Sequence, residues 1–116
     1  MTTDDKYDVD AIATLLADEC ARTILYETLN EPMSAEALSE QCDVSPQTVY
    51  RRLDDLKEHN LIAEQTRLSP AGHHYKVYAA TLNQVVVDLT TDGFEIRVTR
   101  RERMADKFTQ FIEDMR

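Results

Sequence analysis

Glycine and proline are scarce in this chain. Its 116 residues include two glycines and three prolines, so there is no glycine-rich loop of the kind that cradles nucleotide phosphates. The sequence also has no G-x-S-x-G motif and no metal-hydrolase signature. Its acidic residues are numerous but scattered, as on a solvated surface. The pattern predicts no catalytic set, and we expect that the protein is not an enzyme.

Cysteine is equally rare. Cys20 and Cys42 stand alone, without a C-x-C or C-x-x-C motif. Two cysteines are too few for a disulfide scaffold and fit a reducing cytoplasm, and a metal site would need more ligands at suitable spacing. We therefore expect no metal and no cofactor. Redox sensing by a thiol stays open as an alternative, because Cys20 is near a possible helix N-terminus.

Long apolar runs are missing as well. No stretch approaches the ~20 residues of a membrane span, and the acidic N-terminus MTTDDKYDVD does not resemble a signal peptide. We expect a cytoplasmic protein with no membrane partner. The length and the balance of 42% hydrophobic to 30% charged residues indicate one globular domain over residues 1–116.

The negative charge is unevenly distributed. The formal net charge is -9, and residues 1–44 alone hold 11 acidic and 2 basic side chains. Residues 45–76 hold 5 basic and 4 acidic side chains, and the stretch SPQTVYRRL, at 45–53, has two arginines and no acid. Abundant Asp and Glu with only four lysines resembles the composition of proteins from salt-loving archaea. In molar salt the Debye length is roughly 3 Å, so local contacts would outweigh bulk repulsion.

Hydrophobic spacing predicts four helices in the first half of the chain. They are expected at about 8–17, 19–30, 35–42 and 45–60. Asp18, Ser34 and Ser45 are suitable N-caps, and Pro46 is a favoured first helical residue. Asn60 suits a left-handed helix stop.

The pattern changes to strands after residue 60. LIAEQTRL and YKVYAATL read as strands on either side of the turn SPAGHH, giving a hairpin, or wing, at about 61–80. Helix, helix, short turn, helix and hairpin is the order of a winged helix-turn-helix. We expect an α+β, mainly helical fold with this core over residues 8–80.

Two further elements follow the predicted core. QVVVDL and FEIRV, joined by TTDG, predict an additional hairpin over 82–99 with one apolar face. The segment 100–116 predicts an amphipathic C-terminal helix, at about 101–115, with an apolar stripe. Two recognition helices read a palindrome only when they are joined, so we expect a homodimer. The dimer candidates are Ile12, Leu15, Leu16, Met104, Phe108, Phe111, Ile112 and Met115.

The fourth helix has the pattern of a recognition helix. With Val49 at the centre of the buried face, Gln47 and Arg51 fall on the opposite face. Gln47 could pair with an adenine edge and Arg51 with a guanine, while the helix start could bind phosphate. The alternative interpretation is an ordinary capped surface helix without a binding role, since a Ser-Pro pair is found at the start of helices in many folds.

The stretch SAEALSEQCDVSPQTVYRRLDDLKEHNLIAEQ resembles winged helix-turn-helix transcription regulators of the ArsR-like type. The resemblance covers residues 11–80, about 60% of the chain, and with the composition suggests a haloarchaeal type. It implies a sequence-specific regulator that binds double-stranded DNA. The DNA-contacting positions would be Ser45, Gln47, Thr48, Tyr50, Arg51 and Arg52 on the helix, and Arg67, His73, His74 and Lys76 on the wing.

Other interpretations stay open. His73 and His74 could contact DNA or could be solvated turn residues. The chain could also be an adaptor that docks a protein on the additional hairpin, or a sensor gated by a ligand or by oxidation. Whether a small-molecule effector exists, and what it would be, is left open by the sequence.

Overall fold

Four helices form one layer of the molecule. The computed structural model describes residues 3–4 and 8–101. The helices are α1 (Val9–Ala17), α2 (Glu19–Glu27), α3 (Ala35–Cys42) and α4 (Pro46–Glu58). None of these described helices has the length and apolar character needed to cross a membrane. The expected C-terminal helix, with Met104, Phe108, Phe111, Ile112 and Met115, lies outside the described residues.

Each helix begins where a polar side chain accepts a backbone hydrogen bond. The N-caps are Asp8, Asp18, Ser34 and Ser45, which confirms the three caps predicted for the second, third and fourth helices. Helix α2 is shorter than expected, because it ends at Glu27 rather than near Asn30. The buried hydroxyl of Thr28 donates to the Ile24 carbonyl at 2.7 Å and closes the last turn.

Two residues in the left-handed conformation set the ends of the helix-turn-helix unit. Asp43 has φ 54° and ends α3, and the turn to α4 is closed by the Val44 N–H, which donates to the Ser39 carbonyl at 3.3 Å. Asn60 has φ 58° just after α4, as predicted. Both positions reverse the chain without a glycine, since Asn and Asp tolerate this conformation better than most residues.

The strands form two hairpins, and both predicted hairpins are confirmed. The wing pairs β2 (Ile62–Leu68) with β3 (His74–Ala80), and the additional hairpin pairs β4 (Leu82–Thr90) with β5 (Gly93–Arg100). A short strand that the sequence did not predict, β1 (Thr3–Asp4), pairs with β5 and gives a three-stranded sheet of order β1-β5-β4.

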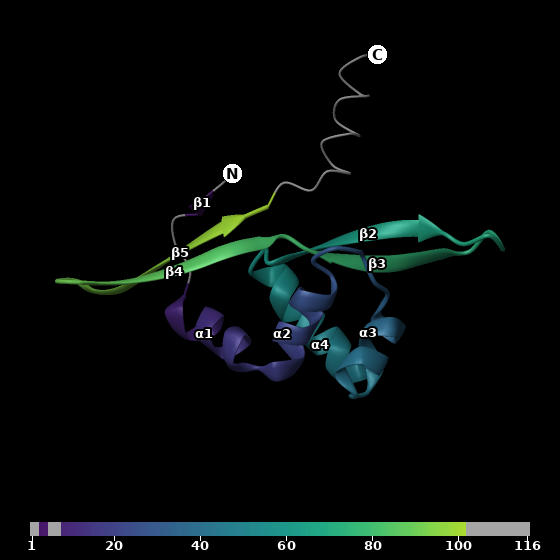
Figure 1. Cartoon of the computed structure of the whole chain (residues 1–116), viewed down its shortest axis with the longest axis horizontal. Coiled ribbons are helices and arrows are strands. Elements are labelled where there is room, and N and C mark those ends of the chain that lie inside the picture. The colour runs from purple at the N-terminus through teal and green to yellow at the C-terminus, as the bar shows by residue number, and fades with distance from the viewer. Residues whose placement is uncertain (1–2, 5–7, 102–116) are drawn as a thin grey trace, which may run out of the picture.

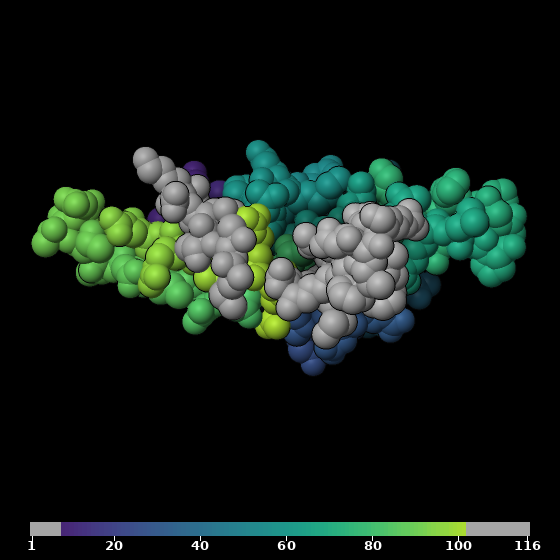
Figure 2. Space-filling model, turned by 90° about the horizontal axis from the view of Figure 1, so that it is seen from above, coloured from purple at the N-terminus to yellow at the C-terminus, as the bar shows by residue number. Residues whose placement is uncertain are grey.

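The two hairpins extend in opposite directions from the helical layer (Figure 1). Only Thr81 separates β3 from β4, and its N–H and that of Leu82 both donate to the Leu61 carbonyl. The chain therefore crosses the helices almost without interruption. Seen from above, the ends of the wing and of the β4–β5 hairpin form the two tips of the molecule (Figure 2).

The core lies between the helices and the bases of both hairpins. Its largest fully buried side chains are Ile12, Ile24, Thr28, Leu38, Val49, Leu53, Leu56, Leu61 and Val98. They come from all four helices, from the residues just after α2 and α4, and from β5. Helix α4 contributes three of them at helical spacing, which leaves its opposite face free to be polar.

The apolar face predicted for the additional hairpin is present but only partly buried. The register pairs Val85 with Val98, Val87 with Ile96 and Leu89 with Phe94. Near the helices Ile96 and Val98 are buried, whereas Leu89 and Phe94 at the tip are 74% and 64% exposed. Of the α1 dimer candidates, Ile12 and Leu15 belong to the chain's own core and Leu16 is partly buried against it.

We expect Leu53→Ala to lower the free energy of unfolding by about 2–5 kcal/mol, because it opens a cavity in the core. The matched control is Leu68→Ala on the wing, where the side chain is 62% exposed, and its effect should stay within ~0.5 kcal/mol. Urea denaturation followed by circular dichroism measures both. Equal losses in the two variants would contradict the core described above.

Candidate nucleic-acid interface

The start of α4 is an exposed, acid-free helix N-terminus. The Ser45 hydroxyl accepts a hydrogen bond from the Thr48 N–H at 3.3 Å and lies 3.1 Å from the Thr48 hydroxyl. Pro46 occupies the first turn, which contains no acidic residue. The helix dipole and the backbone N–H groups make this end favourable for an anion such as phosphate.

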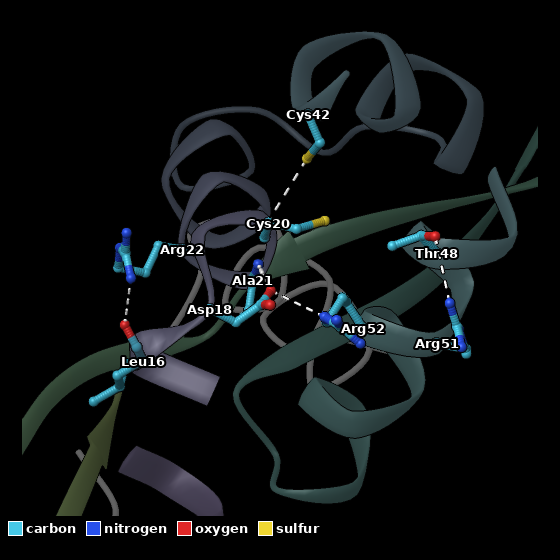
Figure 3. A network of polar contacts seen from close by, with 9 residues as sticks. All are labelled: Leu16, Asp18, Cys20, Ala21, Arg22, Cys42, Thr48, Arg51 and Arg52. Atoms are coloured by element: carbon cyan, nitrogen blue, oxygen red, sulfur yellow. Dashed lines mark hydrogen bonds and ion pairs between the residues drawn. The ribbon is translucent and has the colours of Figure 1, made fainter. Parts of the chain in front are cut away.

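The polar face of α4 continues from this end. Gln47, Tyr50 and Arg51 are exposed, opposite the buried Val49 and Leu53. Arg51 Nη2 donates to the Thr48 hydroxyl at 3.5 Å (Figure 3), so its guanidinium extends along the outer face of the first two turns. The structure thus brings together the hydrogen-bonding side chains that the sequence predicted for this helix.

The same face becomes acidic in the second half of the helix. Asp54 and Glu58 are exposed one and two turns beyond Arg51. A carboxylate near a phosphate group is unfavourable, so this part of α4 is unsuited to a nucleic-acid backbone. The surface of α4 that suits contact with a nucleic acid is therefore its N-terminal half.

Arg52 lies in a different environment from Arg51. Its Nε donates to Asp18 Oδ2 at 2.9 Å, and the same oxygen accepts the Ala21 N–H at 2.8 Å (Figure 3). Asp18 therefore caps α2 and also holds α4. Asp18 and Arg52 are 34 residues apart in the chain, so no local sequence pattern predicts this pair. A DNA contact by Arg52 stays a prediction. Its guanidinium would have to bind DNA while its Nε remains hydrogen-bonded to Asp18.

The pKa values of both partners shift so as to favour the charged pair. Burial alone would raise the pKa of Asp18, but the hydrogen bonds from Ala21 and Arg52 and the positive charge of Arg52 outweigh it and hold that pKa below its ordinary value. The hydrogen bond to Asp18 raises the pKa of Arg52. The two side chains are only 30% and 28% exposed, so the pair is partly protected from solvent screening.

A second group of charges connects α4 with the wing. Glu64 on β2 accepts a hydrogen bond from Lys57 at 3.1 Å and forms an ion pair with Lys76 of β3 at 3.6 Å. The Lys57 hydrogen bond is the main cause that lowers the pKa of Glu64. Lys76, a predicted DNA contact, remains 61% exposed and keeps room for a second partner.

The wing turn presents the remaining predicted residues. The Ser69 N–H donates to the His73 carbonyl at 2.8 Å, and the His73 N–H donates to the Ser69 hydroxyl at 3.1 Å. Gly72 has φ 88°, a conformation that other residues rarely adopt. Arg67, His73 and His74 are all exposed around this turn.

Two apolar side chains of the wing were missed as candidate site residues. Leu68 and Tyr75 are 62% and 42% exposed near the turn, and Tyr75 lies opposite Arg67 in the register. The alternation of the two strands was a usable signal, since it places Arg67 and Tyr75 on one face of the hairpin. The wing therefore presents an exposed aromatic ring beside an arginine.

The described residues contain no candidate metal-binding cluster. Across residues 8–101, no three or more His, Cys, Asp or Glu side chains are grouped in a way that could hold a metal ion. The described polar groups are engaged with one another or exposed to solvent. The exposed side chains of α4 and the wing can bind anions and donate hydrogen bonds, and any proposed function has to use these two properties.

Comparisons with known proteins agree with the geometry of α2, α3 and α4. Residues 16–65 match the sequence model of a family described as a helix-turn-helix domain. The match spans the end of α1 to the first half of β2. With the hairpin β2–β3 behind it, this part of the chain is a winged helix-turn-helix.

A solved structure with similarity to the chain is that of NolR from Sinorhizobium fredii. The sequences are 15% identical, the alignment covers 91% of this chain and 81% of that one, and the TM-score is 0.48. No curated protein matches the chain.

We predict that Asp18→Asn and Asp18→Ala will differ in stability. Asparagine is as good an N-cap as aspartate, so Asp18→Asn should lose only the ion pair, at a cost under about 1 kcal/mol. Asp18→Ala loses the cap as well and should cost roughly 1–2 kcal/mol. Thermal or urea unfolding at neutral pH measures the difference, and equal stabilities would show that the cap contributes nothing.

The contribution of the Asp18 charge should also depend on pH. Because the folded-state pKa of Asp18 lies below its unfolded value of about 3.9, the stabilisation is complete above that value. It is lost as the pH falls through the lower folded-state pKa. The gap in unfolding free energy between the wild-type chain and Asp18→Asn should therefore close on acidification. A gap that does not shrink as the pH falls below the unfolded value of about 3.9 would argue against the assignment.

Proposed function

We propose that the chain is a DNA-binding transcription regulator. The observation that carries this proposal is the N-terminal half of α4, which is exposed, free of acids and lined by Gln47, Thr48 and Arg51, on a helix-turn-helix whose other face is buried. In helix-turn-helix proteins the second helix of the motif enters the major groove with its N-terminal residues on the base edges. Here that helix is α4.

The geometry supports a division of roles among these residues. Ser45 and Thr48, with the backbone N–H groups of the first turn, would bind a phosphate and set the register of the helix. Gln47 and Arg51 would contact base edges, where Gln favours adenine and Arg favours guanine. Tyr50 lies beside them. Asp54 and Glu58 would remain outside the groove.

The wing would lie against the DNA backbone next to the groove. Arg67, His73, His74 and Lys76 are exposed and grouped around the end of β2–β3. Arg52, by contrast, is best explained as a positioning residue, since its Nε is already held by Asp18 at 2.9 Å. We assign it the task of fixing the rotation of α4 on α2, so that Arg51 and Gln47 face outward.

The overall acidity is compatible with this function. The 11 acidic side chains of residues 1–44 outnumber the 4 acidic side chains of residues 45–76, which hold α4 and most of the wing. Salt screens repulsion over distances greater than the Debye length, whereas a short hydrogen bond to a base edge is screened much less. We propose an ArsR-like regulator adapted to a salt-rich cytoplasm, in which local contacts decide binding.

A homodimer would complete the proposal. A symmetric pair of recognition helices reads the two half-sites of a palindrome. The exposed apolar tip of the additional hairpin, with Val87, Leu89 and Phe94, supports a protein contact in this region. The same observation also favours a second candidate function, an adaptor that docks another protein on this tip without binding DNA.

Arg51→Ala should weaken binding to the chain's own upstream DNA by about 1–3 kcal/mol, or roughly 5- to 150-fold, while leaving thermal unfolding unchanged. Fluorescence anisotropy with that duplex and with a scrambled duplex of equal length, over a salt series up to molar KCl, measures the affinity. The matched control is Arg97→Ala on the additional hairpin, where the guanidinium pairs with Asp88 at 3.5 Å.

The control should bind like the wild-type chain. A wild-type preference for the upstream duplex that persists in high salt would support base readout by Gln47 and Arg51. If the wild-type chain bound neither duplex at any salt concentration, the regulator would be excluded in favour of the adaptor. Equal losses in Arg51→Ala and Arg97→Ala would show that binding follows total charge rather than α4.

The dimer is tested by sedimentation equilibrium of the full chain. We expect a mass twice the 13.3 kDa of one chain. The double variant Leu89→Ser/Phe94→Ser removes the apolar tip without touching the core. If this variant becomes monomeric, the hairpin holds the dimer; if it stays dimeric, the predicted C-terminal stripe gains support. A wild-type chain that sediments as a monomer in molar salt would refute the homodimer.

A further inference from the structure

The two cysteines of the chain meet in the fold although 22 residues separate them. Cys20 is the second residue of α2, and Cys42 is the last residue of α3. Cys42 Sγ lies 3.8 Å from the carbonyl oxygen of Cys20, and both residues are only partly buried (Figure 3). Neither side chain belongs to the DNA-facing surface of α4, so the proposed function leaves this contact unexplained.

The surroundings of the two thiols are unlike each other. Burial, the hydrogen bond with the Cys20 side chain and the negative charges of Glu27 and Asp18 raise the pKa of Cys42 to about 12. Cys42 therefore remains a protonated thiol at neutral pH. Cys20 instead lies in the first turn of α2, where the helix dipole favours a negative charge.

Cys20 also has a cation beside it. Arg52 is close enough that the charge of Cys20 is among the causes that raise the pKa of Arg52, and in Figure 3 the Cys20 sulfur lies between the Cys42 sulfur and Arg52. The two sulfurs therefore have different electrostatic surroundings, with the helix N-terminus and the cation on the Cys20 side. A second thiol within reach is what converts the first oxidation product into a disulfide.

We propose that Cys20 and Cys42 form a reversible thiol–disulfide pair, in which Cys20 reacts with a peroxide and Cys42 resolves the product. The Cys20 thiolate attacks one oxygen of hydrogen peroxide, the O–O bond breaks, and the leaving hydroxide takes up a proton to become water. The Cys42 thiol then attacks the sulfenic sulfur of Cys20. The S–O bond breaks, and hydroxide leaves with the Cys42 proton as a second water. Two thiols are oxidised to one disulfide, and the peroxide is reduced to water.

The disulfide would change the helix-turn-helix, and this step rests on the proposed DNA-binding function. An S–S bond of about 2.05 Å draws the end of α3 towards the start of α2. Cys42 directly precedes the turn Asp43–Ser45, which sets the beginning of α4. Meanwhile Arg52 holds α4 to Asp18, two residues before Cys20. The disulfide would move the turn before α4, while the Asp18–Arg52 contact holds the middle of the helix in place. The phosphate-binding end of α4 would therefore shift, so oxidation should weaken DNA binding.

The chemistry is tested on the full chain without DNA. The protein is treated with hydrogen peroxide, its remaining thiols are alkylated under denaturing conditions, and the intact mass and peptides are measured. We expect an intramolecular Cys20–Cys42 disulfide that a dithiol reductant reverses. Cys42→Ser should accumulate a sulfenic acid at Cys20 that a cyclic 1,3-diketone traps, whereas Cys20→Ser should give no trapped product at Cys42.

The opposite results would overturn the proposal. Both cysteines remaining reduced, or only disulfides between chains, would exclude the pair. Trapping at Cys42 in Cys20→Ser would reverse the assigned roles. Alanine variants at the same two positions serve if a serine variant fails to fold, as judged by circular dichroism.

The regulatory step has its own measurement. Anisotropy with the upstream duplex should show that the peroxide-treated chain binds about 5- to 150-fold more weakly than the reduced chain. In the control, Cys42→Ser with Cys20 alkylated, no bridge can form, so peroxide treatment should leave the affinity unchanged. A disulfide that leaves affinity unchanged would overturn the regulatory step alone. If the reduced chain binds no DNA, the proposed function fails, while the mass measurement still decides whether the thiol pair exists.

Discussion

One carboxylate oxygen joins the start of α2 to the middle of α4. Asp18 Oδ2 accepts the Ala21 N–H at 2.8 Å and Arg52 Nε at 2.9 Å, so it completes the first turn of one helix and fixes the rotation of another. The two donors share a single acceptor, and neither helix can move without disturbing the other. The outward direction of Arg51 therefore depends on the N-cap of a different helix.

The acidity of the chain has a comparable double role. Half of the 22 acidic residues occur in residues 1–44, and Asp18, from this acidic part, becomes the anchor for α4. Glu64 similarly holds Lys57 and Lys76 together across α4 and the wing. These carboxylates are satisfied by cations of the same domain, so they add little repulsion toward an approaching phosphate. The surplus acids remain on the outside, where dissolved salt screens their charge.

Local chemistry made much of the fold predictable from the sequence. Ser34, Ser45 and Asp18 cap helices through contacts within three residues, and Asn60 takes the left-handed stop that its side chain tolerates. The apolar and polar faces of α4 follow from 3.6-residue periodicity. The partners of Arg52 and Cys42 were not predictable, because each comes from a residue more than twenty positions away. Strand β1, with two residues, is too short to leave a pattern.

The half-buried hairpin shows where periodicity stops being informative. Alternation places six apolar side chains of β4 and β5 on one face, but it cannot say how far a covering element reaches. Helix α1, which packs on β5, has nine residues and is about 14 Å long, while the nine residues of β4 extend about 30 Å. Even a parallel helix of this length covers only about half of the strand. The exposure of Leu89 and Phe94 is thus a consequence of the two lengths, and burying this tip requires surface that α1 cannot supply. A second copy of the chain offers such a surface, because its own hairpin carries the same exposed apolar face.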